Sequence, residues 1–144
     1  MGRNLDDFIE ACKAFGLKIT PQRIAIYEEV LKATDHPSAE GIYRILKPSH
    51  PNLSFDTVNR TLLTFAEMGL IQIVEGSGDV RRFDPNIEQH HHLRCLGCGS
   101  ITDFYDRTLD HLKIPKAIRE TFSVKKVRVV IEGTCHRCRR ITCQ

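Results

Sequence analysis

The chain has 144 residues, of which 41% are hydrophobic and 27% are charged, an ordinary composition for one compact domain or two small ones. It contains no run of the roughly 20 apolar residues that a membrane span needs, and its N-terminus lacks the apolar segment of an export signal. We therefore expect a soluble cytoplasmic protein without a membrane partner. Residues 1–89 carry 10 Lys and Arg against 13 Asp and Glu, and residues 90–144 carry 11 against 5, so overall charge does not indicate a nucleic-acid-binding protein.

Three short helices are predicted in the first half of the chain. Thr20, Ser38 and Ser54 each stand where an N-cap belongs, immediately before a segment with apolar residues at helical spacing. Pro21 follows the first of these caps, at a position that suits proline. The third helix, "SFDTVNRTLLTFAEMG", closes on Gly69, where a C-terminal glycine is expected.

The periodicity then changes from helix to strand. The segments "LIQIVE" (70–75) and "VRRFD" (80–84) flank Gly76-Ser77-Gly78, which predicts a β-hairpin with a glycine turn. Three helices followed by a hairpin make a winged helix. We therefore expect a winged-helix domain at residues 1–84, with residues near 84–89 as the linker.

A small α/β domain is predicted at residues 85–144, which makes the whole chain α+β. Short strands are expected around "HHHLRC" (90–95) and "SITDFY" (100–105), and a helical stretch from about 106 to 121. A last strand is expected in "KVRVVIEG" (126–133), in which apolar residues alternate.

The third predicted helix has a polar face suited to reading DNA. One face is apolar, while short hydroxyls and one arginine fall on another: Thr57, Arg60 and Thr64, with Thr61 beside them. Such side chains can contact base edges and phosphates in a major groove. The alternative is an ordinary solvated face. The hairpin that follows, with Arg81 and Arg82 near its tip, favours DNA binding.

Four of the six cysteines form two CxxC pairs: Cys95, Cys98, Cys135 and Cys138. Four thiolates at this spacing match a closed tetrahedral zinc site. Disulfides are less favoured in a chain without an export signal, and a redox use of one pair remains the alternative. A structural zinc would stabilise a domain too small to rely on its core.

Three adjacent histidines precede the first CxxC pair. On a strand, His90 and His92 point to one face and His91 to the other, because side chains alternate. A single histidine is usually only a satisfied polar residue. An HxH pair in a chain that also offers Asp84 and Asp103 supplies mixed nitrogen and oxygen ligands that suit Fe(II), Mn(II) or Zn(II). We therefore predict a second metal site.

Taken together, these patterns resemble the ferric uptake regulator (Fur) family of metal-dependent bacterial repressors over nearly the whole chain. The matching segments are "ITPQR" (19–23), "HPSAEGIY" (36–43), "TVNRTL" (57–62), "RRFD" (81–84), "HHHLRCLGCG" (90–99), "ITDF" (101–104) and "CHRC" (135–138). The resemblance implies a winged-helix DNA-binding domain and a C-terminal dimerisation domain. It further implies a structural Zn²⁺ held by four cysteines and a regulatory metal between the domains.

The resemblance also assigns residues to these roles. The regulatory ligands would be His36, Asp84, His90, His92 and Asp103, of which only His36 lies well inside the first domain. A metal bound there would clamp the domains and shift the population toward a shape that binds DNA. The partner would be a palindromic, AT-rich DNA operator bound by a homodimer, with contacts from Arg23, Ser54, Thr57, Asn59, Arg60, Thr61 and Thr64.

Two positions depart from the family pattern. Asn59 stands where the family usually has tyrosine, so the preferred operator would differ. Some members carry a further metal site on the dimerisation domain. Here His91 and Asp110 occupy two of its positions, but Val127 replaces a histidine, so we do not expect that site.

The signal sensed is predicted from the acidic ligands. The peroxide-sensing PerR branch of the family is similar in having aspartate at both positions, where this chain has Asp84 and Asp103. This similarity implies Fe²⁺ or Mn²⁺ as the regulatory ion. Zn²⁺ would also be able to occupy the site in vitro. Iron sensors more often have glutamate, and zinc sensors a cysteine. Iron sensing is the main alternative, ahead of zinc or manganese sensing.

Two hypotheses come from different classes of protein. One is a mononuclear iron enzyme in which His90, His92 and a carboxylate form a facial triad. The other is a zinc-ribbon interaction module without a sensor. An enzyme would need an open substrate cavity, for which this chain has little material, so we expect neither an enzyme nor a small-molecule substrate.

Overall fold

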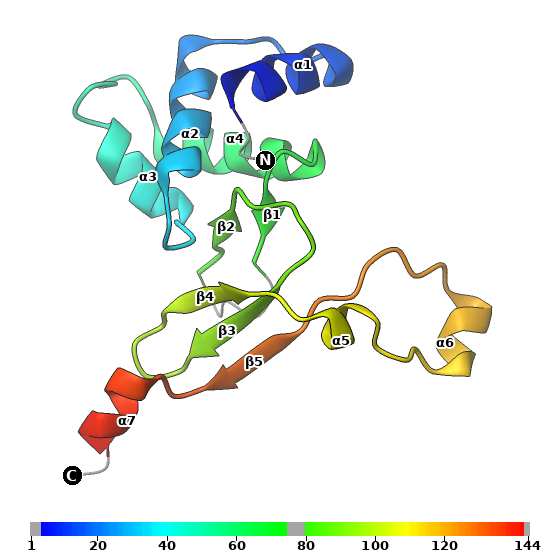
Figure 1. Cartoon of the computed structure of the whole chain (residues 1–144). Helices are drawn as coiled ribbons and strands as arrows, with labels where there is room; N and C mark the ends of the chain where they lie inside the picture. The colour runs from blue at the N-terminus through cyan, green and yellow to red at the C-terminus, as the bar shows by residue number, and fades with distance from the viewer. Residues whose placement is uncertain (1–3, 75–79, 143–144) are drawn as a thin grey trace. The chain divides into compact units, whose positions relative to one another are not determined.

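The structure, a computed structural model, describes residues 4–74 and 80–142 and is shown in Figure 1. The chain divides into two compact units, Met1–Ile87 and Glu88–Gln144. The division falls inside the predicted linker at residues 84–89, three residues after the boundary at 84 given by the hairpin pattern. Among the described residues, no helix is both long and apolar enough to cross a membrane.

The described part of the first unit begins with four helices, coloured blue to green in Figure 1. They are α1 (Leu5–Phe15), α2 (Pro21–Lys32), α3 (Ala39–Leu46) and α4 (Phe55–Glu67). The three predicted helices correspond to α2, α3 and α4. Their predicted caps are confirmed, because Thr20, Ser38 and Ser54 each accept a hydrogen bond from the backbone N–H three residues later, at 3.1 to 3.2 Å.

A two-stranded ribbon follows the helices. Strands β1 (Gln72–Ile73) and β2 (Phe83–Asp84) are antiparallel, with Ile73 opposite Phe83. Gly69 has φ 77°, a left-handed conformation that favours glycine, and it ends the α4 segment just before β1. The predicted glycine turn at residues 76–78 lies outside the described residues.

Three packed aromatic rings hold the first unit together. The ring centroids of Phe8 and Tyr27 lie 4.8 Å apart, and Phe65 meets them edge-on at 5.5 and 5.8 Å. All three side chains are fully buried. Because they come from α1, α2 and α4, this cluster fixes the helix that carries the predicted DNA face.

The second unit is built on a three-stranded sheet in the order β4-β3-β5. Its strands are β3 (His91–Cys95), β4 (Ile101–Phe104) and β5 (Val130–Gly133), with β4 antiparallel and β5 parallel to β3. The short helices are α5 (Arg107–Asp110), α6 (Lys116–Thr121) and α7 (His136–Thr142).

Two secondary-structure predictions for this unit need correction. The helical stretch expected from about 106 to 121 is two helices, α5 and α6, and Pro115 is the N-cap of α6. Proline has no backbone N–H and restricts the residue before it, so a continuous helix cannot pass through this position. The last strand pairs only from Val130, not from Lys126, and α7 was not predicted.

Several large apolar side chains of the second unit are exposed. Leu93 and Ile131, paired across β3 and β5, are 43% and 47% exposed. Ile118 of α6 and Phe122 just after it are 44% and 68% exposed, and no residue of α5 or α6 is buried. The described part of this unit therefore leaves these large apolar side chains uncovered by its own chain.

Truncation of Phe65 should test the aromatic cluster. We expect Phe65→Ala to lower the free energy of unfolding by about 3 to 5 kcal/mol, because it removes a fully buried ring. Phe15→Ala is the matched control, since Phe15 is 53% exposed. Urea unfolding followed by circular dichroism would measure both variants. Equal midpoints for the two would contradict the assignment of this cluster as the core.

Candidate metal sites

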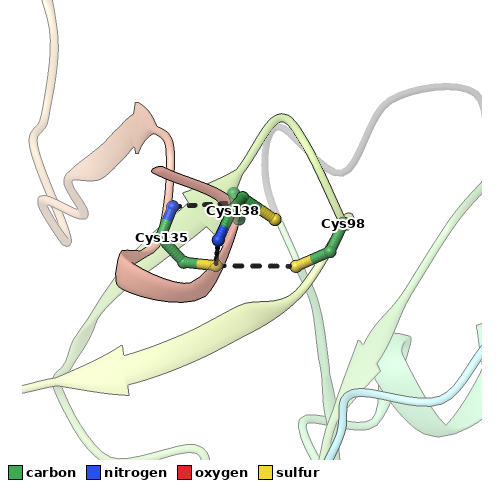
Figure 2. Close-up of side chains that lie close together, drawn as sticks. Cys98, Cys135 and Cys138 are labelled. Atoms are coloured by element: carbon green, nitrogen blue, oxygen red, sulfur yellow. Dashed lines mark hydrogen bonds between the residues drawn. The ribbon is translucent and has the colours of Figure 1, made fainter. Parts of the chain in front are cut away.

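The four cysteines of the CxxC pairs come together at one end of the sheet. Cys95 ends β3, and the parallel register places it opposite Gly133 of β5, so the following residues Cys135 and Cys138 arrive beside it. The four sulfur atoms all lie within 4.8 Å of one another. Figure 2 shows the Sγ atoms of Cys98 and Cys135 facing each other, 3.9 Å apart. Tetrahedral zinc with Zn–S bonds near 2.3 Å requires about 3.8 Å between sulfurs.

The pKa values of two of these thiols shift in opposite directions because the sulfurs lie so close together. A hydrogen bond from the backbone N–H of Cys135, at 3.2 Å from the Cys95 Sγ, lowers the pKa of Cys95 to about 6. In contrast, a hydrogen bond with the Cys135 side chain favours the neutral thiol of Cys138 and raises its pKa to about 12. Four thiolates this close repel one another unless a cation lies between them. The donor set therefore fits Zn²⁺.

Two glycines, one inside the first CxxC pair and one just after it, shape this site. A Cβ added at Gly97 would lie 3.0 Å from the Cys138 Sγ and 3.1 Å from its Cβ. Gly99 has φ 74°, which permits the turn in which its N–H donates to the Cys95 carbonyl at 2.9 Å. The sequence alone does not reveal the role of Gly97, because only the structure shows how closely Cys138 approaches the backbone there.

A second group of possible ligands lies on the same sheet. His92 of β3 stands opposite Asp103 of β4, and its Nε2 lies 3.1 Å from the Asp103 Oδ1. The Nε2 of His90 lies 3.1 Å from the His92 Nε2 and 3.5 Å from the same carboxylate oxygen. Both imidazoles are buried. The predicted alternation of the three histidines is thus confirmed, and it gathers a trio of donors.

Hydrogen bonds from the backbone fix the tautomers of two histidines. The Nδ1 of His90 lies 2.6 Å from the Glu88 carbonyl, which can only accept, so Nδ1 donates and Nε2, the atom beside His92 and Asp103, is the nitrogen left to act as a ligand. His91 is the reverse. Its Nδ1 accepts from the Val129 N–H at 3.0 Å, so its Nε2–H donates to Asp110 at 2.8 Å. Both nitrogens of His91 thus serve to join β3 to neighbouring segments.

The remaining two predicted ligands form a pair in the first unit. The Nε2 of His36 lies 3.3 Å from the Asp84 Oδ2, and the two side chains are 5% and 4% exposed. The other Asp84 oxygen accepts from the Asn86 N–H at 2.9 Å. Imidazole and carboxylate donors of this kind suit Fe²⁺ and Mn²⁺. The five predicted ligands therefore occur as a pair in one unit and a trio in the other.

The polar face of α4 is largely as predicted, with one correction. Ser54 and Arg60 are exposed, and Thr57, Asn59 and Thr64 are half-buried. Thr61 is only 8% exposed. It lies three residues after Val58 and four before Phe65, so the helix turns it toward the core. Thr61 therefore offers little surface to a base edge.

Two arginines are occupied by contacts within the first unit. Arg23 donates to the Lys18 carbonyl at 2.6 Å, which holds the segment before α2. Arg82, expected near the hairpin tip, instead donates to the carbonyls of Asp35 and His36. The sequence alone does not reveal this role of Arg82, since the contact spans more than forty residues along the chain.

Comparison with known proteins identifies the group to which the chain belongs. The model described as "Ferric uptake regulator family" matches residues 14–132. The chain belongs to the ferric uptake regulator family. The proposed alternative of a mononuclear iron enzyme is therefore set aside in favour of a transcription regulator.

Curated Fur-family relatives match nearly the whole chain. It is 37% identical over 134 residues to the peroxide operon regulator of Bacillus subtilis, covering 93% of this chain and 92% of that protein. It is 33% identical over 135 residues to the peroxide-responsive repressor PerR of Staphylococcus epidermidis, covering 94% and 90%. The resemblance noted in the sequence is thus confirmed.

Solved structures of Fur-family proteins share the α+β fold. The Helicobacter pylori ferric uptake regulator aligns with TM-score 0.75 at 24% identity, over 94% of this chain and 91% of that one. PerR from Streptococcus pyogenes aligns with TM-score 0.53 at 30% identity, over 92% and 90%.

Substitution at Gly97 should weaken zinc binding. We expect Gly97→Ala to lower zinc affinity about tenfold or more, because the new Cβ would push Cys138 from its place and ligand orientation is worth this much. Gly133→Ala is the matched control, since a Cβ there meets nothing within 4 Å. Competition with a chromogenic chelator would measure both. Equal zinc affinities for the two variants would contradict the packing at Gly97.

Proposed function

We propose that this Fur-family chain is a metal-dependent transcriptional repressor that senses peroxide. The single observation that carries the proposal is the 33% to 37% identity, over more than nine-tenths of the chain, to proteins named as peroxide-responsive regulators. The two acidic ligands agree with it, because Asp84 and Asp103 are both aspartates, as in the peroxide-sensing branch of the family. Such a repressor acts in the cytoplasm, where its DNA is.

The DNA partner is a palindromic, AT-rich operator read by α4. Exposed Ser54 and Arg60 and half-buried Thr57, Asn59 and Thr64 supply hydroxyl, amide and guanidinium groups of the kind that contact bases and phosphates. Arg60 is held by an ion pair with Asp56 at 3.0 Å, one turn before it on the same helix. Asn59, in place of the usual tyrosine, can pair with the edge of an adenine.

The partner for the second unit is another copy of the chain. Leu93 and Ile131 are exposed neighbours on β3 and β5, and Ile118 and Phe122 are exposed elsewhere in the unit; a homodimer would cover such apolar side chains. A symmetric dimer presents two copies of α4 and therefore matches a palindrome. The four cysteines hold a structural Zn²⁺ that orders this unit.

The switch is a regulatory ion that takes donors from both units. Alone, the His36–Asp84 pair supplies two donor groups and the His90, His92 and Asp103 trio supplies three, whereas Fe²⁺ and Mn²⁺ prefer five or six ligands. One ion bound by all five ligands would connect the two units of the chain. Its binding then favours the arrangements of the dimer that fit the operator.

Peroxide releases the repressor by oxidising a ligand. Fe²⁺ held by the five ligands would activate the peroxide. One peroxide oxygen is inserted into a ring C–H bond of His36 or His90, and the other leaves as water. Loss of that imidazole as a ligand removes the link between the units and with it the preference for DNA.

The second candidate is an iron-sensing repressor of the same family. It is favoured by the likeness to the Vibrio cholerae ferric uptake regulator, with TM-score 0.66 at 27% identity over 88% of this chain. Such a protein would leave DNA when Fe²⁺ is withdrawn, and peroxide would leave its histidines unchanged.

Removal of His36 should weaken the response to metal. We expect His36→Ala to weaken Mn²⁺-activated operator binding about tenfold or more while the protein stays dimeric, because the first unit loses one of its two ligands. His50→Ala, in the same unit and outside the ligand set, should behave as the parent. Gel shift with and without Mn²⁺, with sizing chromatography, would measure this. A variant that responds to metal like the parent would contradict the proposal that the metal joins the two units through His36.

Peroxide should add oxygen to the iron-loaded protein alone. We expect mass spectrometry to find one added oxygen on the peptide of His36 or His90 after peroxide treatment of the Fe²⁺ form, and none in the Mn²⁺ form. Asp103→Glu should keep Fe²⁺-dependent DNA binding yet resist oxidation, because a longer carboxylate can bind through both oxygens and compete with peroxide. An unmodified Fe²⁺ form that stays on DNA would make iron sensing the better account.

A further inference from the structure

His36 sits in a loop whose backbone needs support. The residue has φ 56°, the left-handed region that non-glycine residues adopt at a cost. It lies between α2 and α3, where Ala33 ends one helix and Ser38 caps the next. Its imidazole is nevertheless held at 3.3 Å from Asp84. Something must fix this loop against the ribbon that carries Asp84.

Arg82 makes that connection. Its Nε donates to the His36 carbonyl, and its Nη2 donates to the Asp35 carbonyl at 2.6 Å. The two bonds reach two consecutive peptide groups, and a planar guanidinium holds its donors in a fixed geometry that the flexible ammonium of a lysine lacks. Around them, Ser38 pairs with Arg82 in an antiparallel bridge, and the Phe83 N–H donates to the Pro37 carbonyl at 2.9 Å.

We infer that Arg82 is a positioning residue for the regulatory metal, which it serves by presenting His36. The inference rests on the proposed function, since it concerns the same site. Arg82 lies two residues before Asp84. One short segment therefore carries the ligand Asp84 and also the arginine that positions the other ligand of the pair, His36. The pair is thereby formed before metal arrives, and metal binding does not have to order the loop.

The same contacts distinguish Arg82 from its neighbour. Arg81 is exposed, whereas Arg82 is half-buried. Side chains alternate along an extended segment, so the two arginines face opposite ways. Arg81 is thus the residue of the two that is placed to meet phosphate, and Arg82 is the one that acts within the protein.

The test is the affinity of the zinc-loaded, full-length dimer for Mn²⁺ in the absence of DNA. We expect Arg82→Gln to weaken Mn²⁺ binding about 10- to 100-fold, the usual effect of losing a group that orients a ligand. Arg81→Gln removes the same charge one residue away and should leave Mn²⁺ affinity unchanged. Arg82→Lys, which keeps the charge but not the fixed planar arrangement of donors, should fall between the two. Zinc content should be equal in all.

A double-mutant cycle separates positioning from general support of the fold. If Arg82 acts through His36, Arg82→Gln should cause no further loss of Mn²⁺ affinity in a His36→Ala background. Losses that add would overturn the inference, as would an Arg82→Gln protein with parental affinity. Should Arg82→Gln fail to fold, the same cycle with Arg82→Lys decides. Failure of the proposed function would give a different result: the parent protein would bind the operator equally well without metal.

Discussion

The register of β3 is the constraint on which both metal sites depend. This five-residue strand is paired on both sides, and its pairing with β4 sets His92 opposite Asp103. Its pairing with β5 sets Cys95 opposite Gly133 and so brings the second CxxC pair to the first. A slip of one residue would turn every β3 side chain to the other face. The histidine trio and the four-cysteine cluster would then be lost together.

Zinc and the sheet therefore support each other. The helices α5 and α6 bury no residue, and large apolar side chains remain exposed in this unit, so its own core contributes little stability. Thiolate ligation adds free energy that is coupled to folding, and it does so at the end of β3 where the register must hold. His91 adds a second tie, because both its ring nitrogens bond to neighbouring segments. The histidine trio is thus built on a strand fixed at several points.

Much of this could be predicted because it depends on local pattern. The alternation along a strand placed His90 and His92 together, the two CxxC pairs gave the sulfur cluster, and hydroxyl residues gave the helix caps. The errors have equally physical causes. Thr61 shares the polarity of the DNA face but not its helical phase, and Pro115 splits a stretch that hydrophobic spacing alone reads as one helix. The role of Arg82 and the tight fit at Gly97 depend on contacts between distant segments, which a sequence does not display.

The proposed regulatory ion would link the two units and thereby couple metal binding to DNA binding. Thermodynamic linkage makes this measurable, since any factor by which Mn²⁺ tightens operator binding must equal the factor by which operator tightens Mn²⁺ binding. Titration of the zinc-loaded dimer with Mn²⁺, with and without a saturating operator duplex, measures the second factor directly. The account predicts about tenfold or more tighter Mn²⁺ binding with operator, and no change with a duplex of unrelated sequence. An Mn²⁺ affinity that is the same with operator and without DNA would contradict it.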